Sequence, residues 1–208
     1  RGHLRHQYGV DLSGVTWVQG SINQPGAHGE PSVLPLLAPV PIEVNDSGKS
    51  LSQLLDEGAI DAIIGTTLPE SRRHNPNVRR LFPDFREVEK AYYRDTGIFP
   101  IMHLVAIRRE VYERNPFIAD SLYRAFCAAK RVALAKMRNL AALRYMLPWL
   151  AAELDDIEQV FGDDPWPYGI ERNRATLDAL MTYLVEQSVI AAPLHLQDLF
   201  LPVTTEEH

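Results

Sequence analysis

The residues with the clearest chemical potential are grouped around one histidine. Residues 96–103 read TGIFPIMH, and the β-branched run with a basic end that follows at residues 104–109 reads LVAIRR. Pro100 lacks a backbone N–H and fixes φ, so it favours the start or the edge of a strand. His103 would then lie early in a strand over residues 99–109. Its imidazole has an ordinary pKa of about 6.5, which suits proton transfer near neutral pH.

A single histidine at such a position has two interpretations. The commoner one is a core side chain whose ring nitrogens are satisfied by hydrogen bonds, because buried polar groups are usually paired. The other is a site residue that gives or takes a proton. Local sequence leaves both open for His103.

A group of arginines precedes this segment and could bind an anion. Residues 72–76 read RRHNP, and Arg79 and Arg80 follow shortly after. A guanidinium group binds a carboxylate in a bidentate way, so a dicarboxylate ligand would require such residues. For Arg72 and Arg73 the favoured interpretation is a solvated loop that balances nearby acids. For Arg79 and Arg80 the two interpretations carry equal weight.

The first half of the chain predicts short strands with a helix between them. Strands are expected at residues 15–19, 42–44 and 61–65, a long loop over residues 21–41, and a helix over residues 51–57. The β-α-β order predicts parallel strands, and open parallel sheets bind ligands at the carboxyl ends of their strands. The candidate ligand contacts at those ends are Gln19, Gly20, Ser21, Gly65, Thr66 and Thr67.

The second half of the chain predicts helices. The helical spacing of apolar residues indicates helices over residues 83–95, 116–137, 140–146, 148–160 and 170–190, and a short one over residues 196–200. Cys127 falls in one of them and indicates an inert buried thiol. As the only cysteine it excludes an intramolecular disulfide and a zinc site built from cysteines.

The composition of the chain limits the kinds of partner that it is expected to bind. The 208 residues are 46% hydrophobic and 23% charged, which is ordinary for a globular protein, and the formal net charge is −6. No run of Lys and Arg marks a nucleic-acid surface, so nucleic acid is not an expected partner. No apolar run is long enough to predict a membrane span.

An ordered series of motifs resembles a known family. The series comprises RLFPDF at residues 80–85, VE at 88–89, YY at 92–93, TGIFPIMH at 96–103, DDPWPYG at 163–169, and Asn173. From about Tyr8 to the C-terminus the chain is similar to the 4,5-dihydroxyphthalate decarboxylase family. That family looks related in fold to the substrate-binding proteins of ABC transporters, the type 2 periplasmic-binding-protein fold.

The resemblance implies an α/β fold of two lobes. Residues 1–98 would form the second lobe, a parallel α/β unit. Residues 99–208 would supply a strand that crosses the hinge and the C-terminal helices that complete the first lobe. The N-terminal part of the first lobe is expected to lie outside this sequence.

The resemblance also implies an activity, a lyase reaction in bacterial aromatic-compound catabolism. It would be the cofactor-independent decarboxylation of a hydroxylated aromatic dicarboxylate in the cleft between the lobes, without a metal. His103 would be the proton donor or relay, and Arg79 and Arg80 would anchor a carboxylate. Stacking on the ring, or hydrogen bonding to it, is expected from Tyr93, Trp166 and Tyr168, although packing is an equally weighted role for Trp166 and Tyr168.

The alternative function is a solute-binding protein that delivers a small organic anion to an ABC transporter. A cytoplasmic location is expected for the enzyme and a periplasmic one for the binding protein. The expected partner is a small aromatic or organic anion in either case, and formation of a homo-oligomer stays open.

Overall fold

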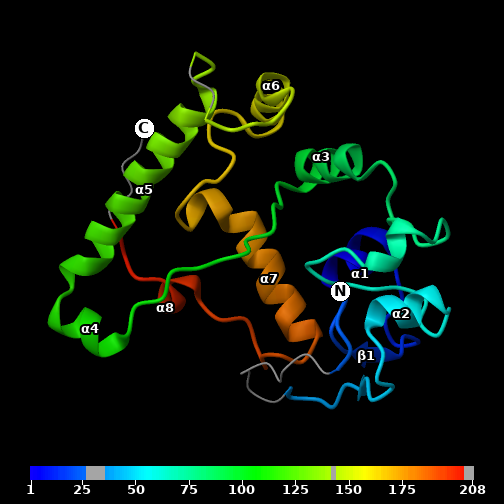
Figure 1. Ribbon diagram of the computed structural model, residues 1–208. Helices are drawn as coiled ribbons and strands as arrows, with labels where there is room; N and C mark the ends of the chain where they lie inside the picture. The colour runs from blue at the N-terminus through cyan, green and yellow to red at the C-terminus, as the bar shows by residue number, and fades with distance from the viewer. Residues whose placement is uncertain (27–35, 142–143, 204–208) are drawn as a thin grey trace. The chain divides into compact units, whose positions relative to one another are not determined.

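The computed structural model describes residues 1–26, 36–141 and 144–203 (Figure 1). The chain divides into two compact units. Unit 1 comprises Arg1–Phe85 and Val185–Ala191, and unit 2 comprises Arg86–Leu184 and Ala192–His208.

Unit 1 begins with a helix and a pair of short strands. Helix α1 spans Gly2–Tyr8 and ends at Gly9, whose φ of 65° is a left-handed conformation that glycine adopts without strain. Strands β1 (Trp17–Gln19) and β2 (Ile42–Val44) pair in parallel, with Trp17 opposite Ile42. The strands predicted at residues 15–19 and 42–44 are thus confirmed in their parallel arrangement.

Helix α2 (Leu51–Asp56) follows β2 and starts at a capping box. The backbone N–H of Gln53 donates to Ser50 Oγ at 3.2 Å, and the backbone N–H of Ser50 donates to Gln53 Oε1 at 2.8 Å. Two further amides at this end donate to carbonyl groups in the loop after β1, Leu51 to Ser21 and Ser52 to Ile22. The predicted cap at Ser50 is confirmed, and the helix N-terminus is tied to the end of β1.

The strand predicted at residues 61–65 is wrong. This segment has no strand conformation, and Ile64 is 65% exposed. A strand requires a neighbour to accept and donate its ladder hydrogen bonds. Within the described part of the chain, the sheet of unit 1 contains β1 and β2 alone. The segment leads instead to a turn of 3₁₀ helix, η1 (Glu70–Arg73).

Unit 2 is helical. Its elements are α3 (Phe85–Thr96, whose first residue belongs to unit 1), α4 (Arg109–Arg114), α5 (Phe117–Arg138), α6 (Leu150–Phe161), the 3₁₀ turn η2 (Glu171–Asn173), α7 (Arg174–Glu186, whose last two residues belong to unit 1) and α8 (Leu196–Leu199). The predicted helices over 83–95, 116–137, 148–160 and 196–200 are confirmed within a few residues.

Two helix predictions need correction. The region predicted as one helix over residues 170–190 is a 3₁₀ turn followed by the shorter α7. Residues 140–141 and 144–146 are not helical, and residues 142–143 of that prediction lie outside the described residues. Pro148 disfavours a helical conformation at the residue before it, which limits any helix that approaches it.

The segment with the key histidine does not form the predicted strand. Residues 97–108 connect α3 to α4 without helix or strand, as the green ribbon of Figure 1 shows. Its apolar side chains are largely in solvent, with Met102 70%, Leu104 67% and Val105 63% exposed. The sequence has the composition of a buried strand, but no strand among the described residues pairs with it.

Buried side chains are few. The hydrophobic ones are Leu51 in unit 1 and Ala119, Leu150, Leu177, Met181 and Leu196 in unit 2. Helix α5 has 22 residues, yet no helix in the described ranges is apolar enough along a sufficient length to cross a bilayer.

Candidate functional site

Unit 1 contains a pocket lined by three arginines. The pocket has a volume of about 510 Å³, and its polar lining is Arg72, Asn75, Arg79 and Arg80. This volume lies within the range of small-molecule sites, about 300–1,000 Å³. We call it the arginine pocket. Two of its four polar residues, Arg79 and Arg80, are the carboxylate anchors that the sequence predicts.

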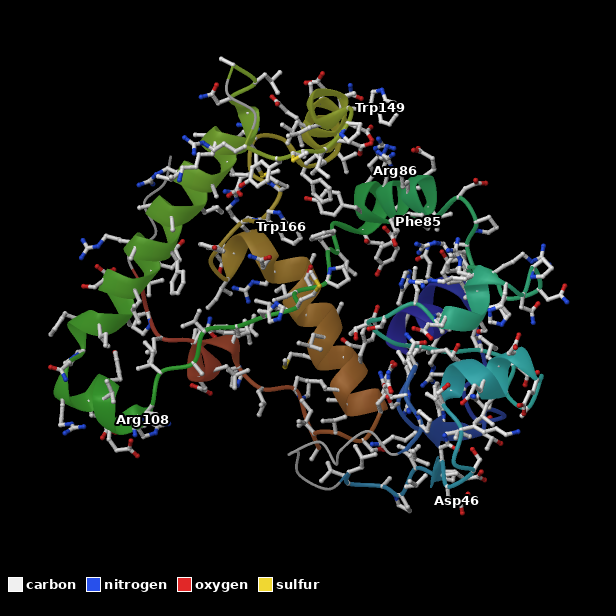
Figure 2. The ribbon with its side chains drawn as sticks, in the orientation of Figure 1. Asp46, Phe85, Arg86, Arg108, Trp149 and Trp166 are labelled. Atoms are coloured by element: carbon white, nitrogen blue, oxygen red, sulfur yellow. The ribbon has the colours of Figure 1, made fainter. Side chains whose placement is uncertain are left out.

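The rest of the lining is apolar. It is formed by Pro76, Val78, Pro83 and Phe85. The Arg80 guanidinium carbon lies 4.4 Å from the centroid of the Phe85 ring, within the range of a cation–π contact. Phe85, labelled in Figure 2 at the start of α3, therefore fixes one face of this guanidinium group. The pocket combines positive charge with a flat apolar wall.

Buried hydroxyl groups hold the segment that carries Arg72. Ser52 on α2 and Ser71 on η1 are both buried; Ser52 Oγ donates to Ser71 Oγ at 3.0 Å, and the Ser71 amide donates to Ser52 Oγ at 2.9 Å. The Ser71 carbonyl in turn accepts from the Asn75 amide at 2.8 Å. Arg72 therefore stands on a turn that is fixed against α2.

Asn75 lies in the turn between Arg72 and Arg79. Its Nδ2 donates to Asp56 Oδ1 at 2.7 Å, and its Oδ1 accepts from the Asn77 amide at 2.9 Å. His74 Nε2 lies 3.3 Å from the other oxygen of Asp56. The hydrogen bond from Asn75, followed by that from His74, holds the pKa of the Asp56 carboxyl below its usual value. Asp56 thus stays ionised near neutral pH and holds the turn between Arg72 and Arg79.

The pocket arginines lack ionic partners in the structure. Among the described residues, no carboxylate lies within 4.0 Å of the guanidinium groups of Arg72, Arg79 or Arg80. Arg86 of unit 2, labelled in Figure 2, differs, because its guanidinium group contacts Glu153 at 2.7 Å and Asp156 at 2.9 Å. The pocket therefore carries positive charge without an ion pair among the described residues, which favours an anionic ligand.

The two loops predicted to flank a ligand lie together in unit 1. Asn23 joins them, because its Nδ2 donates to the Leu68 carbonyl at 3.0 Å and its Oδ1 accepts from the Glu70 amide at 2.9 Å. Gly65 lies so close to Ile22 that an added Cβ would be 2.3 Å from Ile22 Cδ1. Gly20 is similarly crowded, with Asn45 and Leu51 3.1 Å from such a Cβ.

The remaining loop residues of the prediction are Gln19, Ser21, Thr66 and Thr67. The Gln19 carbonyl accepts from the Asn45 amide at 2.9 Å, the Ser21 carbonyl accepts from Leu51, and both threonines are exposed. These carbonyl groups are used to join β1 to β2 and to α2. A contact of the four residues with ligand stays a prediction.

His103 lies in unit 2, on the exposed connection between α3 and α4. Its imidazole is exposed and makes no hydrogen bond to the described residues, so the interpretation as a satisfied core histidine finds no support there. Its place in a crevice between lobes stays a prediction.

Two of the predicted ring-binding residues of unit 2, Tyr93 and Trp166, pack against other aromatic rings of that unit. Tyr93 lies 4.5 Å, centroid to centroid, from Phe161, and Phe99 lies 5.1 Å from Trp166. Trp166, labelled in Figure 2, is 48% exposed in the loop between α6 and α7. These edge-to-face and tilted contacts supply a packing role for Tyr93 and Trp166.

Tyr168 belongs to a cluster around a charged pair that sequence reasoning missed. Lys130 Nζ lies 2.7 Å from Asp164 Oδ2, donates to the Trp166 carbonyl at 2.8 Å, and lies 4.3 Å from the centroid of Tyr168. Asp164 belongs to the DDPWPYG motif, so the sequence marks this residue. No sequence pattern indicates that its partner is Lys130 on α5. The contacts fix the loop of residues 163–169 to α5.

Cys127 is half-buried on α5, near Tyr123. Burial raises the pKa of the Tyr123 phenol, and the neighbouring Cys127 raises it further. Within the described residues, no group of three His, Cys, Asp or Glu side chains is placed to hold a metal ion.

No family model matches the chain. The chain is 30% identical over 207 residues to the 4,5-dihydroxyphthalate decarboxylase of Comamonas testosteroni, an alignment that covers 99% of this chain and 62% of that protein. It is 34% identical over 92 residues to the 4,5-dihydroxyphthalate decarboxylase of Pseudomonas putida, which covers 44% of this chain and 35% of that one.

The similarity confirms the family-level resemblance that the motifs indicate. The chain spans about 62% of the length of the first of these relatives.

Proposed function

We propose that the protein is a decarboxylase of a hydroxylated aromatic dicarboxylate similar to 4,5-dihydroxyphthalate. The observation that carries this proposal is the similarity over 99% of the chain to a relative of that name. The arginine pocket supports it, because a dicarboxylate leaves water only where cations replace its hydration. In this proposal the pocket belongs to a type 2 periplasmic-binding-protein-like fold of two lobes.

The proposed chemistry needs no cofactor. A hydroxyl group para to the departing carboxylate donates electron density to the ring, and an imidazolium group donates its proton to the ring carbon that bears the carboxylate. The bond from that carbon to the carboxylate then breaks, its electron pair returns to the ring, and CO2 leaves. The imidazole regains a proton from solvent. His103 is our candidate for this donor.

The arginines would hold the carboxylate that stays on the ring. Arg79 and Arg80 have no carboxylate partner within the described chain, so an ordered anion would not have to compete with an internal one. Fixing that group places the other carboxylate for departure, which is the contribution that positioning makes to such a reaction.

One observation favours the alternative, a non-catalytic binding protein for a small organic anion. The lining of the arginine pocket consists of Arg, Asn, Pro, Val and Phe side chains. None of these gives or takes a proton near neutral pH. The pocket by itself therefore supports binding, and catalysis requires a group from elsewhere, which the proposal assigns to His103.

The experiment is an assay of CO2 release from 4,5-dihydroxyphthalate by the full-length protein and its His103→Ala variant. We expect turnover in the wild type and a loss of about a hundredfold or more in the variant, the scale of a general acid–base residue. The melting temperature should stay nearly unchanged, because His103 is exposed. Binding of 4,5-dihydroxyphthalate without CO2 release would overturn the enzyme and favour the binding protein.

A further inference from the structure

We propose that His74, held by Asp56, is the general base that takes the proton from the ring hydroxyl group para to the departing carboxylate. This inference rests on the proposed function, and it adds a second histidine whose task is distinct from that of His103. His74 belongs to the RRHNP segment of residues 72–76, to which the proposed reaction assigns no proton transfer.

The first argument is the contact between the His74 imidazole and a carboxylate. His74 Nε2 lies 3.3 Å from Asp56 Oδ2, and no other carboxylate in the described ranges lies within 4.0 Å of this imidazole. The hydrogen bonds from Asn75 and His74 hold the pKa of Asp56 below its usual value, so this carboxyl group is ionised near neutral pH. A carboxylate in this place balances the charge of the imidazolium ion that forms when the ring accepts a proton.

The second argument is the tautomer of the neutral His74 ring. An ionised carboxylate only accepts hydrogen bonds, so His74 Nε2 donates to Asp56 and carries the ring proton. His74 Nδ1 then has a free lone pair, and no hydrogen bond occupies it within the described part of the chain. The side chain is 66% exposed, so a ligand can reach this nitrogen. A neutral ring held in this way is prepared to accept a proton at Nδ1.

The place of His74 beside the arginine pocket is the third argument. His74 directly follows η1 and lies in the chain between Arg72 and Asn75, which both line the pocket. In the proposed function the cations hold the carboxylate edge of the ring, whereas its hydroxyl groups are on the opposite edge. A base for such a hydroxyl group is therefore needed beside the lining residues and not among them, and His74 has this position in the chain.

The other charged groups of α2 and η1 leave this task to His74. Glu57, at the C-terminal end of α2, pairs with Lys49 at 2.6 Å. The charged residues of η1 are Glu70, Arg72 and Arg73. Arginine stays protonated and carboxylates stay ionised near neutral pH, whereas imidazole is the type of side chain that exchanges protons there.

In the proposed step, His74 Nδ1 takes the hydroxyl proton as the O–H bond breaks, and the electron pair stays on the oxygen. The resulting phenolate shifts electron density towards the ring carbon that His103 protonates. The bond to the carboxylate then breaks, CO2 leaves, and the electron pair of that bond restores the aromatic ring. The oxygen regains its negative charge and takes the proton back from the His74 imidazolium, so the base is ready for the next turnover.

The test is the pH profile of kcat for CO2 release from 4,5-dihydroxyphthalate by the full-length protein, as wild type and as His74→Gln. We expect kcat near neutral pH to fall about a hundredfold in the variant, the lower end of what a general base contributes. The decrease of kcat at acidic pH, which reports protonation of a base, should be absent in the variant. The ratio of the two kcat values should shrink towards about pH 10, where a phenol ionises without a base.

Asp56→Asn tests the tautomer. Asn75 Nδ2 donates to Asp56 Oδ1 at 2.7 Å, so the oxygen of the introduced amide stays with Asn75 and its NH2 group faces His74 Nε2. That nitrogen must then accept, which moves the ring proton to Nδ1 and removes the base. We expect kcat to fall nearly as far as in His74→Gln. The double variant should lose little more, because both changes remove the same base.

The matched control is Arg73→Gln. Arg73 directly precedes His74 and is equally exposed, and it does not line the pocket. Its replacement removes a charge from the same turn without removing a base, so kcat should change less than twofold. Phthalate, the same dicarboxylate without the ring hydroxyl groups, should bind to His74→Gln within twofold of its affinity for the wild type in isothermal titration calorimetry. This result would show that the arginine pocket is intact in the variant.

The outcomes separate this inference from the proposed function. If the wild type releases CO2 and His74→Gln has the same pH profile, or if His74→Gln and Arg73→Gln lower kcat equally, the base is overturned and the decarboxylase stands. If the wild type binds 4,5-dihydroxyphthalate and releases no CO2, the proposed function fails and the role of His74 fails with it.

Discussion

Asn23→Ala should loosen the connection between the loop after β1 and the segment that precedes the arginine pocket. The Asn23 side chain makes two hydrogen bonds across 45 and 47 residues of sequence, to the Leu68 carbonyl and from the Glu70 amide. Alanine removes both and leaves the two backbone groups to water. Residues 65–67, which carry the predicted ligand contacts, lie directly before Leu68 and lose this attachment.

The magnitude follows from the two bonds. A hydrogen bond within a protein contributes a net 0.5–1.5 kcal/mol, so two contribute about 1–3 kcal/mol. Asn23 is half-buried and its partners are reached by water after the change, so we expect the lower part of this range, about 1–2 kcal/mol. Urea denaturation of the full-length protein measures this difference from the shift in midpoint at a constant slope.

Two further variants isolate the cause. Gln24→Ala changes the exposed neighbour, whose side chain makes no hydrogen bond to the described residues, and should alter stability by less than about 0.5 kcal/mol. Asn23→Asp keeps the acceptor for the Glu70 amide and loses the donor to Leu68, so it should retain part of the stability. Hydrogen exchange at the Glu70 amide should therefore accelerate in Asn23→Ala and much less in Asn23→Asp. Equal stabilities of Asn23→Ala and Gln24→Ala would refute the reasoning.

Two other predictions concern unit 2. The hydrogen bond from Lys90 is the largest cause that holds the pKa of Asp156 below its usual value. The stability that this hydrogen bond contributes is therefore present above the pKa of aspartate in the unfolded chain, about 3.9. It is lost as pH falls through the lower pKa that Asp156 has in the folded protein. Asp156→Asn should therefore lower the urea midpoint at pH 7, and the difference from wild type should shrink towards pH 3; a constant difference would contradict this origin. Thr176 Oγ1 donates to the Phe99 carbonyl and accepts from the Phe99 amide at 3.1 Å, so Thr176→Val should destabilise by about 1–2 kcal/mol in thermal unfolding. The control Thr182→Val removes one exposed hydrogen bond within α7 and should have the smaller effect.

Local signals predicted the helices well. Ser50 and Gln53 form a capping box that is visible as a sequence pattern, and the structure has both of its hydrogen bonds. The apolar stripe of α5 placed that helix within one residue of its observed bounds at each end. Such features depend on residues within one or two turns of each other, so the sequence contains the information directly.

Strands were predicted less well, because a strand depends on its neighbours. Residues 61–65 and 99–109 have the β-branched composition of strands, yet neither is paired within the described chain. By contrast, β1 and β2 are short and less apolar, but each has the other as its partner. Composition indicates that a segment is suited to a buried strand. The strand forms only where a neighbouring strand pairs with it and other elements cover its apolar side chains.

The candidate site was predicted only in part, because its geometry also depends on contacts between residues that are far apart in the sequence. The carboxylate-binding chemistry of arginine predicts Arg79 and Arg80 as site residues, and both line the pocket. Arg72 and Arg73 are indistinguishable in sequence, and only the turn of η1 makes one of them a lining residue. The Ser52–Ser71 contact that fixes this turn spans 19 residues and has no sequence signature.

The two parts of the proposed reaction are anion binding by the arginine pocket and proton donation by His103, and they differ in the contacts that hold their residues in place. The arginine pocket is built from residues 72–85, and the contacts that position it come from α2, so its ability to bind an anion follows from local and short-range structure. His103 lies on a connection whose apolar side chains face solvent and whose backbone pairs with no described strand. A proton donor must be held within hydrogen-bond reach of the atom it protonates. Binding and turnover should therefore respond differently to perturbation. Changes at Arg72 or Asp56 should alter ligand affinity, whereas changes within residues 99–107 that leave the pocket intact should remove turnover and keep affinity. Adding three positive charges to that segment, with Met102→Lys, Leu104→Lys and Val105→Lys together, is the sharpest test of this argument. Equal losses of phthalate affinity and CO2 release would show that the two parts are one cooperative structure.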